Sequence, residues 1–426
     1  MLVKKEYKIC SGVNLTCIPS KKFKTVKLSF TMFTPLNPET ASKNAIIPEL
    51  LTTSCKKYPS LSSISKCLDN LYGADISSGV DKHGDVQVLT VSSSCINNEL
   101  TFESHNDILF EISNLLCEVI FNPLVDENGF IEKNVSQQKR QLIEIIESEL
   151  NDKRSYAKYR CEQLMCKEEK FGINKYGTIQ DVKKITGKEV LKAWENLLQT
   201  SRIEIMAIGN TDPNLIKEVF EKYFSNIERK NIVECKTEVI REVKESKTYN
   251  DKMDITQCKL VMGFRTNSAR DDIDVPATRL MIALLGGTPN SKLFLNVREK
   301  LSLCYYCSSR YDKQKGIMLI ESGVEEANIE KAKESILSQI EDIKAGNFSK
   351  DDVDATKMYL SQSFKKINDR LNSLDDWYIL QTFSKLTKSP EEVIEEINKV
   401  TDNEIIKAAN KLSLDTIYIL SKKINE

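Results

Sequence analysis

An internal repeat constrains the fold of this chain more than any other feature of its sequence. The segment DVKKITGKEVLKA, residues 181–193, aligns without a gap to EINKVTDNEIIKA, residues 396–408, and the offset is about half of the 426-residue chain. Each copy leads into a helix pattern and then a strand pattern, SRIEIMAIGN in the first copy and DTIYILSK in the second. The identical pairs are Lys184/Lys399, Thr186/Thr401, Glu189/Glu404, Lys192/Lys407 and Ala193/Ala408. The repeat therefore predicts two homologous halves that share one fold.

Hydrophobic periodicity within the halves predicts both strands and helices. Residues 24–34 alternate apolar and polar side chains, as a strand does, and CKLVMGFRT at 258–266 echoes this run in the second half. A further strand pattern covers 85–96. Amphipathic helix patterns occupy 44–56, 60–73, 106–123 and 129–166. The chain is therefore predicted to have an α+β fold.

The boundary between the halves is predicted in the charged segment at 228–252. This segment has few apolar side chains that could anchor it to a core, which is typical of a solvated linker. We expect an N-terminal half at 1–227 and a C-terminal half at 253–426.

Charge and hydropathy exclude several classes of protein. Lys and Arg total 61 against 62 acidic residues, so the chain lacks the basic excess that is typical of nucleic-acid-binding proteins. No run approaches the roughly 18 apolar residues of a membrane-spanning helix, and the N-terminal stretch becomes polar too early for a signal peptide. We therefore expect a cytoplasmic protein with neither a nucleic-acid partner nor a membrane span.

Twelve cysteines are scattered along the chain, mostly beside apolar residues. Cys304 and Cys307 form one CxxC pair, CYYC, but a single pair without a nearby His is a weak signal for zinc or redox chemistry. Buried, reduced thiols are the interpretation that we favour for a cytoplasmic protein.

One segment of the second half combines a fixed cation with a phenol. In ALLGGTPNSKLFLNVREKLSLCYY, residues 283–306, Arg298 precedes Tyr305 by seven positions. This segment, the strand KLVMGFRT and the first-half segment GTIQDVKKITGKEVLKAW together resemble the insulinase/pitrilysin-type metallopeptidase family. That family also contains mitochondrial processing peptidase subunits and respiratory-complex core proteins. The resemblance covers nearly the whole chain and implies two halves, each a mostly antiparallel sheet covered by helices, facing each other across a peptide-binding cavity.

The zinc motif of that family is degenerate in this chain. Active members carry His-x-x-Glu-His on the first long helix of the first half, where the two imidazoles bind zinc and the Glu activates water. The corresponding helix here reads NAIIPELLTT, with Ile46 and Leu50 at the histidine positions and Glu49 at the position of the general base. Aliphatic side chains cannot ligate zinc, so we expect Glu49 to be a helix-surface carboxylate and expect no cofactor in this chain.

No other residues offer a replacement site. The chain contains only two histidines, His83 and His105, in separate polar segments where surface positions are expected. Glu144 and Glu147 fall near the third zinc ligand of the family, but glutamates on a long helix usually form a solvated face.

The resemblance gives Arg298 and Tyr305 a role in binding substrate. In the family, the arginine holds a carbonyl of the bound peptide and the tyrosine hydroxyl helps to stabilise the oxyanion. Without the resemblance, an exposed Arg at a helix end and a Tyr packed in a sheet would be the simpler interpretation. Some bacterial members are heterodimers in which one subunit has the zinc motif and the other keeps only the Arg/Tyr pair.

Three functions follow for this chain. The first, which we favour, is a catalytically inactive, peptide-binding subunit that complements a zinc-bearing paralogue, as a heterodimer, or that forms a homodimer. Its peptide would be bound partly as a strand added to a sheet edge. The second is a non-proteolytic assembly protein, like the respiratory-complex core subunits. The third is an enzyme that uses Cys304 and Cys307, which is the weakest because no His lies near them in sequence to activate a thiol.

Overall fold

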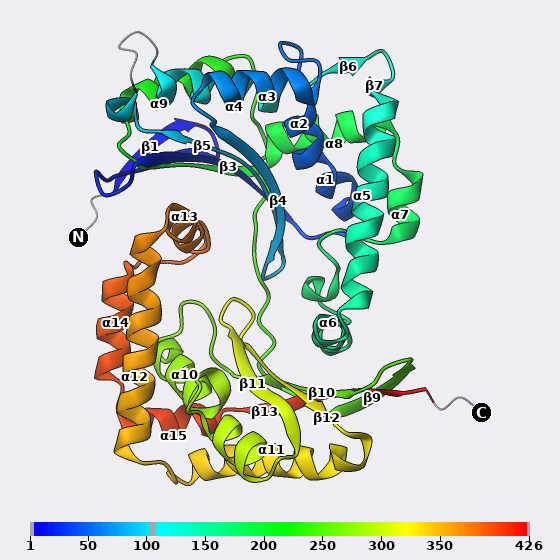
Figure 1. The fold of residues 1–426 in the computed structure, drawn as a ribbon, viewed down its shortest axis with the longest axis vertical. Helices are drawn as coiled ribbons and strands as arrows, with labels where there is room; N and C mark the ends of the chain where they lie inside the picture. Colours follow the sequence, from blue (N-terminus) through cyan, green and yellow to red (C-terminus); the bar gives the residue numbers. More distant parts are fainter. Residues whose placement is uncertain (1–3, 102–106, 424–426) are drawn as a thin grey trace. The chain divides into compact units, whose positions relative to one another are not determined.

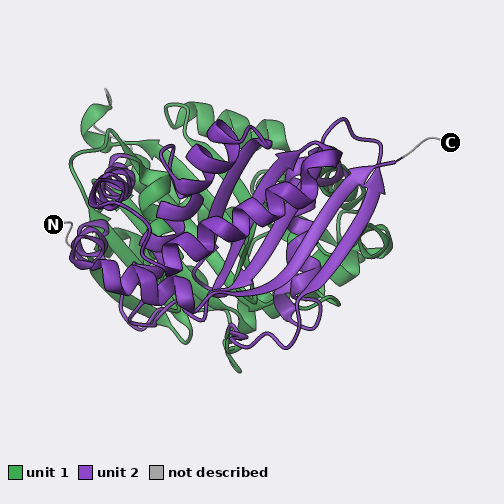
Figure 2. Ribbon diagram, turned by 90° about the horizontal axis from the view of Figure 1, so that it is seen from below, with its two compact units in different colours: residues 1–146, 173–236, 370–383 green, residues 147–172, 237–369, 384–426 purple. Residues whose placement is uncertain are grey.

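The structure is a computed structural model, and it describes residues 4–101 and 107–423. The chain divides into two compact units (Figure 2). Unit 1 contains Met1–Ile146, Ile173–Lys236 and Arg370–Phe383, and unit 2 contains Glu147–Gly172, Thr237–Asp369 and Ser384–Glu426. Two segments thus belong to the unit built mainly from the other half of the sequence: residues 147–172 lie in unit 2 and residues 370–383 lie in unit 1.

Unit 1 is built on a six-stranded sheet with the order β1-β2-β8-β3-β5-β4. Its neighbouring strands are antiparallel except for the parallel pair β2 and β8. The strands are β1 (Lys5–Cys10), β2 (Val13–Pro19), β3 (Thr25–Pro35), β4 (Asp75–His83), β5 (Val86–Ile96) and β8 (Arg202–Gly209).

The helices of unit 1 cover both faces of this sheet (Figure 1). They are α1 (Ala41–Ala45), α2 (Ile47–Thr53), α3 (Leu61–Asn70), α4 (Ile108–Phe121), most of α5 (Glu132–Asn151), α7 (Ile179–Lys184), α8 (Gly187–Thr200), α9 (Pro213–Phe224) and α13 (Leu371–Ile379). A short hairpin of β6 (Val125–Asp126) and β7 (Gly129–Phe130) precedes α5.

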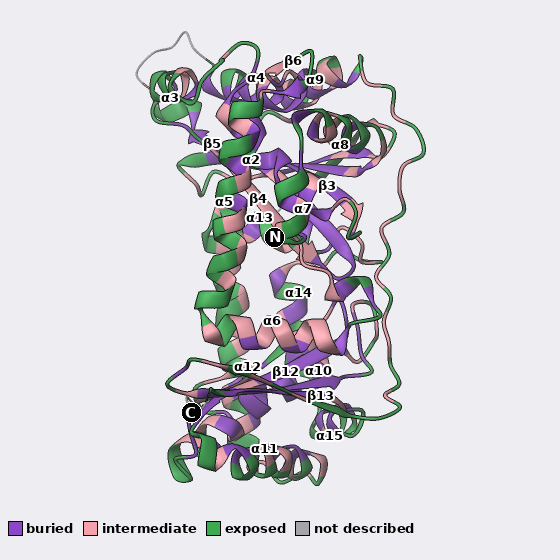
Figure 3. Ribbon diagram, turned by 90° about the vertical axis from the view of Figure 1, so that its right-hand side faces the viewer, coloured by how far each residue is buried: buried purple, intermediate pink, exposed green. Residues whose placement is uncertain are grey.

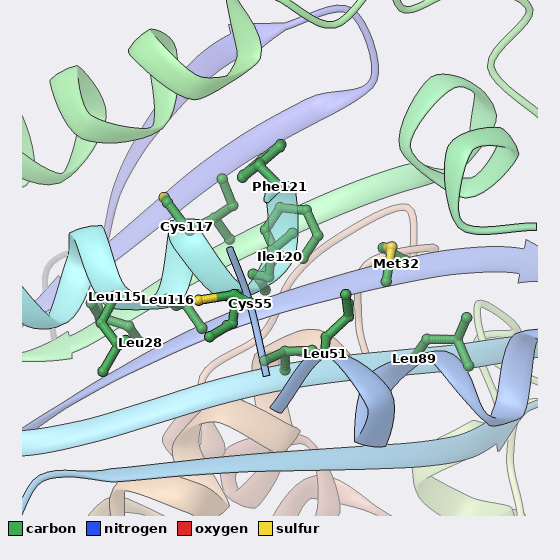
Figure 4. Packing of buried hydrophobic residues seen from close by; sticks show 14 of the residues in the cluster. Leu28, Met32, Leu51, Cys55, Leu89, Leu115, Leu116, Cys117, Ile120 and Phe121 are labelled. Carbon is green, nitrogen blue, oxygen red and sulfur yellow. The ribbon is translucent and has the colours of Figure 1, made fainter. Parts of the chain in front are cut away.

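Strand β3 has apolar side chains that pack on both faces of the unit 1 sheet. Its even-numbered apolar residues, such as Leu28 and Phe30, join the core formed with α4 and α9, where the Phe30 ring packs against Phe121. Figure 4 shows Leu28 of β3 and Leu115 of α4 among the side chains of this core. The odd-numbered Phe33 instead packs edge-on against Phe383 of the 370–383 segment, with ring centroids 5.1 Å apart. Because successive side chains of a strand point to opposite faces, β3 is buried on both sides.

Unit 2 repeats the same design with a five-stranded sheet in the order β11-β12-β10-β13-β9. Only the pair β13 and β9 is parallel. The strands are β9 (Lys247–Met253), β10 (Cys258–Arg265), β11 (Cys304–Asp312), β12 (Ile317–Val324) and β13 (Ser413–Lys422). The helices are α6 (Lys153–Met165), α10 (Val275–Ile282), α11 (Ile329–Lys344), α12 (Lys350–Lys365), α14 (Pro390–Lys399) and α15 (Asp402–Asn410), with two π-helical segments, η3 (Ala283–Gly287) and η4 (Leu293–Lys300).

The two sheets have equivalent connectivity, which confirms the predicted duplication. Taken in spatial order, β2, β8, β3, β5 and β4 of unit 1 correspond to β9, β13, β10, β12 and β11 of unit 2, with the same parallel or antiparallel relation at every step. The repeated sequence motif also has one structural role: Thr186 and Thr401 each cap a helix through a capping box with the Glu three residues later. The predicted α+β class, with two halves that are mostly antiparallel sheets covered by helices, is confirmed.

Several elements differ from the sequence predictions. The helix predicted at 129–166 is two helices, because the Asp152 side chain accepts a hydrogen bond from the Arg154 amide and begins α6. The helix predicted at 44–56 is divided at Ile46 into α1 and α2. The expected linker runs without helix or strand as far as residue 246, and its last residues form the edge strand β9.

Burial follows the layered design within each unit. The central strands of both sheets are mostly buried, whereas the edge strands β1, β4 and β9 are exposed or half-buried along nearly all of their length. Helix α5 is exposed along most of its length (Figure 3). Among the described residues, no helix combines the length and the apolar character that crossing a membrane requires.

Candidate functional site

A pocket in unit 2 contains both members of the Arg/Tyr pair. Its volume is about 420 Å³, and it lies where η4 leads into β11. Ser302 makes the turn between these elements with a positive φ of 49°, an uncommon backbone conformation for a residue other than glycine. The lining residues are Arg298, Glu299, Ser302, Leu303, Cys304, Tyr305, Glu325 and Asn328.

Arg298 is positioned by the π-helical segment η4. π-helical turns are rare and occur frequently at functional sites. The guanidinium carbon lies 4.5 Å from the centroid of the Phe294 ring, four residues earlier, and Nη1 lies 3.5 Å from Glu299 Oε1. The side chain is still 38% exposed, so the stacking orients the guanidinium while leaving donors available to a ligand.

Tyr305 is turned towards solvent by a β-bulge. In the β11–β12 ladder Cys304 pairs with Val324 and Tyr306 pairs with Gly323, so Tyr305 is the extra residue between them. A bulge reverses the inside–outside alternation of a strand, and the Tyr305 side chain is 63% exposed instead of packed into the sheet. Its hydroxyl lies 3.5 Å from Oε1 of Glu325, the residue that follows β12. The corresponding β4–β5 ladder of unit 1 has a regular register, so the bulge is specific to the second half.

The charges of the pocket favour a ligand that both donates and accepts hydrogen bonds. Arg298 and the Tyr305 hydroxyl are donors, whereas the carboxylates of Glu299 and Glu325 are acceptors. Because two carboxylates accompany one guanidinium, an anion such as phosphate would be repelled as well as attracted. A peptide backbone, with its alternating C=O and N–H groups, matches this set.

The two cysteines of the CxxC pair lie on β11, beside this pocket. Cys304 lines it, and Cys307 lies further along β11; both side chains are at most 8% exposed. A hydrogen bond from Cys307 lowers the pKa of the Cys304 thiol, with further support from Ser322 and the charge of Arg298. The same hydrogen bond raises the pKa of Cys307. Of the two thiols, Cys304 is therefore the more acidic.

The degenerate motif of unit 1 is part of the hydrophobic core. Ile46 and Leu50 are each 2% exposed and belong to the core cluster around β3 and α4. The Leu50 amide donates to the Ile46 carbonyl across 3.2 Å, so the two side chains follow one another along the helix with the spacing that a His pair would need. Glu49 points away from this core, is exposed, and accepts a hydrogen bond from Ser78 Oγ on β4.

The described residues do not fit a zinc ion. In the part of the chain that the structure describes, no three His, Cys, Asp or Glu side chains are grouped closely enough to hold a metal. Glu144 and Glu147 are exposed on α5, and His83 is buried at the end of β4, which differs from the expected surface position. His105 lies outside the described residues.

Sequence reasoning missed the part of the pocket that Glu325 and Asn328 contribute. Glu325 and Asn328 come about 20 residues after Tyr305, beyond the next strand, and only the β11–β12 pairing brings them beside it. The role of Phe294 under Arg298 could have been predicted, because residues four apart on a helix are neighbours.

Comparisons with known proteins agree with this fold. The family described as "Peptidase M16 inactive domain" matches residues 184–360, which include Arg298 and Tyr305. Over 409 residues the chain is 32% identical to "Probable inactive metalloprotease YmfF" of Bacillus subtilis (strain 168), with 96% of each chain covered. A conserved protein from Enterococcus faecalis V583 has a similar crystal structure, with a TM-score of 0.92 at 26% identity over 99% of both chains. A peptidase M16 inactive domain from Pseudomonas fluorescens shares the fold, with a TM-score of 0.81 at 15% identity over the full length of both chains.

Proposed function

The chain belongs to the peptidase M16 family, the insulinase/pitrilysin type, as a homologue of inactive members, and from this premise we propose that it binds peptides without cleaving them. In this proposal it acts as the non-catalytic subunit of a zinc peptidase. Arg298 and Tyr305 bind the peptide, and a zinc-bearing relative supplies the metal and the activated water. The observation that carries the proposal is that these two side chains, from two different elements, line one pocket.

The pocket supports the binding of a peptide backbone in an extended conformation. The Arg298 fork can hold a carbonyl oxygen with two N–H donors, and the Tyr305 hydroxyl can donate to an oxygen of the next peptide group. Glu299 and Glu325 can accept backbone N–H groups or an N-terminal amine. These hydrogen bonds are made to the peptide main chain and not to its side chains, so the site would tolerate many peptide sequences.

The edge strand β4 of unit 1 is a candidate position for an added strand. It is the outermost strand of its sheet, and its side chains are exposed or half-buried as far as Lys82. Unpaired backbone groups of an edge strand can form a ladder with an extended peptide. Glu49, held at Ser78 of this strand, would then serve as an acceptor beside the peptide and not as a general base.

Peptide binding is tested directly with the purified chain. A mixture of fluorescein-labelled peptides of about ten residues is titrated with protein, and fluorescence anisotropy is measured. We expect Arg298→Ala to weaken binding about ten-fold or more, because hydrogen bonds to a charged group contribute roughly 1.5–3 kcal/mol. The matched control is Arg310→Ala: Arg310 is exposed on the same strand as Tyr305 but does not line the pocket.

The outcomes separate the peptide-binding subunit from the assembly protein. Binding that weakens in Arg298→Ala but not in Arg310→Ala supports the peptide-binding subunit. Absence of binding by the wild-type chain alone and in the presence of a zinc-bearing paralogue would favour the assembly protein. Size-exclusion chromatography of the chain with and without that paralogue distinguishes a heterodimer from a homodimer.

A further inference from the structure

The CxxC pair has a geometry that a regular strand cannot provide. The chemistry that this geometry permits is independent of peptide binding and so goes beyond the proposed function. We propose that Cys304 and Cys307 form a reactive dithiol site beside the Arg298/Tyr305 pocket, in which Cys304 reacts with small peroxides and Cys307 completes a reversible disulfide.

The β-bulge places the two side chains on the same face of β11. Residues three apart on a regular strand point to opposite faces. Here Cys304 pairs with Val324 and Cys307 pairs with Ser322, so three steps on β11 match two steps on β12. The inserted residue is Tyr305, which is exposed, while both cysteines are buried. Because the two thiols share this face, each shifts the pKa of the other, lowering that of Cys304 and raising that of Cys307.

The spacing of the pair permits a disulfide. Two steps along the partner strand correspond to about 6.6 Å, which is near the upper end of the roughly 4.4–6.8 Å between Cα atoms bridged by disulfides. Closing the bond would therefore draw the ends of the bulge together. Tyr305 lies between the two cysteines, so the same movement would displace its side chain within the pocket.

Cys304 differs from Cys307 in its access to the pocket and in the charge beside it, and these differences indicate which sulfur reacts first. Cys304 lines the pocket and faces Arg298, whereas Cys307 does not line it. A thiol beside a cation and a hydrogen-bond donor has more thiolate character, and the thiolate is the nucleophile. A small oxidant that enters the pocket would therefore react with Cys304 before Cys307.

The reaction balances with a peroxide as the oxidant. The Cys304 thiolate attacks one peroxide oxygen, a sulfur–oxygen bond forms, and the oxygen–oxygen bond breaks. Cys304 is oxidised to a sulfenic acid, and the leaving oxygen takes a proton and departs as water or an alcohol. The Cys307 sulfur then attacks the Cys304 sulfur. The new disulfide displaces hydroxide, which leaves as water with the Cys307 proton. Two thiols lose two electrons and two protons in total.

Digestion with trypsin places both cysteines in a single peptide, so the oxidation state of the pair can be measured from the mass of that peptide. Cleavage after Lys300 and Arg310 releases LSLCYYCSSR, which contains both cysteines of the pair and no others. The matched control is CEQLMCK, residues 161–167, which contains Cys161 and Cys166; both are fully buried and neither lines the pocket. The native, reduced chain is treated with about one equivalent of hydrogen peroxide, the remaining thiols are blocked, and the peptides are measured by mass spectrometry.

We expect LSLCYYCSSR to lose about 2 Da, the mass of two hydrogens, and to regain it with dithiothreitol, while CEQLMCK stays unchanged. Cys307→Ser should leave Cys304 as a sulfenic acid that dimedone traps. In the absence of peroxide, native Cys304 should react with iodoacetamide several-fold faster than Cys235, although Cys235 is the more exposed residue. Arg298→Gln should reduce this advantage.

The alkylation of the wild-type chain needs no variant to fold. Cys304 reacting no faster than Cys235 would overturn the proposal. Peroxide treatment that leaves LSLCYYCSSR without the internal disulfide, in a chain whose circular dichroism spectrum is native, would also overturn it. A result of either kind would leave peptide binding untouched, because that is measured separately by anisotropy.

Discussion

Arg265 Nη2 on β10 donates a hydrogen bond to Glu169 Oε1 across 2.6 Å, although almost a hundred residues separate them. Both side chains are at most 3% exposed, and Lys315 Nζ lies 2.7 Å from Glu169 Oε2. Glu169 follows α6, in the segment 147–172 that lies in sequence between two parts of unit 1 but belongs to unit 2. This carboxylate therefore anchors a segment from the first half to the sheet of the second.

We expect Glu169→Gln to destabilise the protein by roughly 3–5 kcal/mol, because the change removes the buried negative charge that Arg265 and Lys315 share, although Arg265 keeps its ion pair with Asp415. Burial raises the pKa of Glu169, but the hydrogen bonds from Arg265 and Lys315 outweigh it and hold the folded-state pKa below the ordinary value of 4.5. The resulting stability is present above the unfolded-state pKa and is lost as pH falls through the folded-state value. Urea denaturation at pH 7 and at pH 4 measures both effects.

The control for this prediction is the neighbouring exposed carboxylate. Glu168→Gln should change the free energy of unfolding by no more than about 0.5 kcal/mol. Equal effects of the two substitutions would show that the buried cluster has no special role.

The duplicated helix caps predict matching effects in the two units. Thr186→Ala and Thr401→Ala should each cost about 1 kcal/mol, since each removes the side-chain acceptor of a capping box. Thr→Ser at either position keeps the acceptor and should be nearly neutral. Thermal or urea unfolding of the four variants is the measurement, and a loss at only one position would mean that the repeated sequence does not keep its role in both halves.

The sequence predicted the elements whose hydrophobic pattern is local. The strand at 24–34, the helix at 106–123 and the repeated capping motif all lie close to their expected positions. By contrast, β4 was not predicted, because its polar run DISSGVDKH lies at a sheet edge and has no strong alternation of buried residues.

Features that depend on pairing between distant segments could not be predicted. The bulge at Tyr305 is defined by the register of β11 against β12, and nothing in CYYC by itself specifies an extra residue. The assignment of residues 147–172 to unit 2 depends in the same way on Arg265 and Lys315, which lie about 100 and 150 residues away. The sequence could name Arg298 and Tyr305, but only the fold adds Glu325 to their pocket.

The purified chain should bind no stoichiometric zinc and cleave no peptide. The reason is structural, because Ile46 and Leu50 belong to the core and the described residues provide no alternative group of ligands. Metal analysis after dialysis, combined with a fluorogenic peptide assay, tests this. One zinc retained per chain, with hydrolysis that a chelator abolishes, would contradict it.

Restoring the histidines, as Ile46→His with Leu50→His, should not restore activity. Both positions are 2% exposed, so the imidazoles would replace aliphatic groups in a packed core, and the chain should lose several kcal/mol of stability. Metal binding should be weak at most, because side chains that orient ligating imidazoles also determine affinity. Isothermal titration with zinc and urea denaturation measure the two effects. A stable double variant with full peptidase activity would show that only two positions separate this chain from an active enzyme.

Tyr305→Phe should leave the fold and the assembly intact, because the ring is already largely exposed and only a hydroxyl is removed. In a reconstituted pair with a zinc-bearing paralogue, it should nevertheless slow turnover, since loss of one oxyanion donor typically costs roughly 10²–10³ in rate. Arg298→Ala should instead raise KM more than it lowers kcat, because its contacts form with the bound peptide before reaction. Arg298→Lys should rescue only in part, since an ammonium lacks the planar fork.

The control for Tyr305→Phe is Tyr359→Phe, because Tyr359 is an exposed tyrosine on α12 that does not line the pocket. Steady-state kinetics of each reconstituted pair, with size-exclusion chromatography to verify assembly, provide the measurement. If Tyr305→Phe and Arg298→Ala both show the kinetics of the wild-type pair in a complex that forms normally, then the pocket contributes nothing to catalysis. The stacked guanidinium and the bulged tyrosine would then be surface features of a protein that acts through assembly alone.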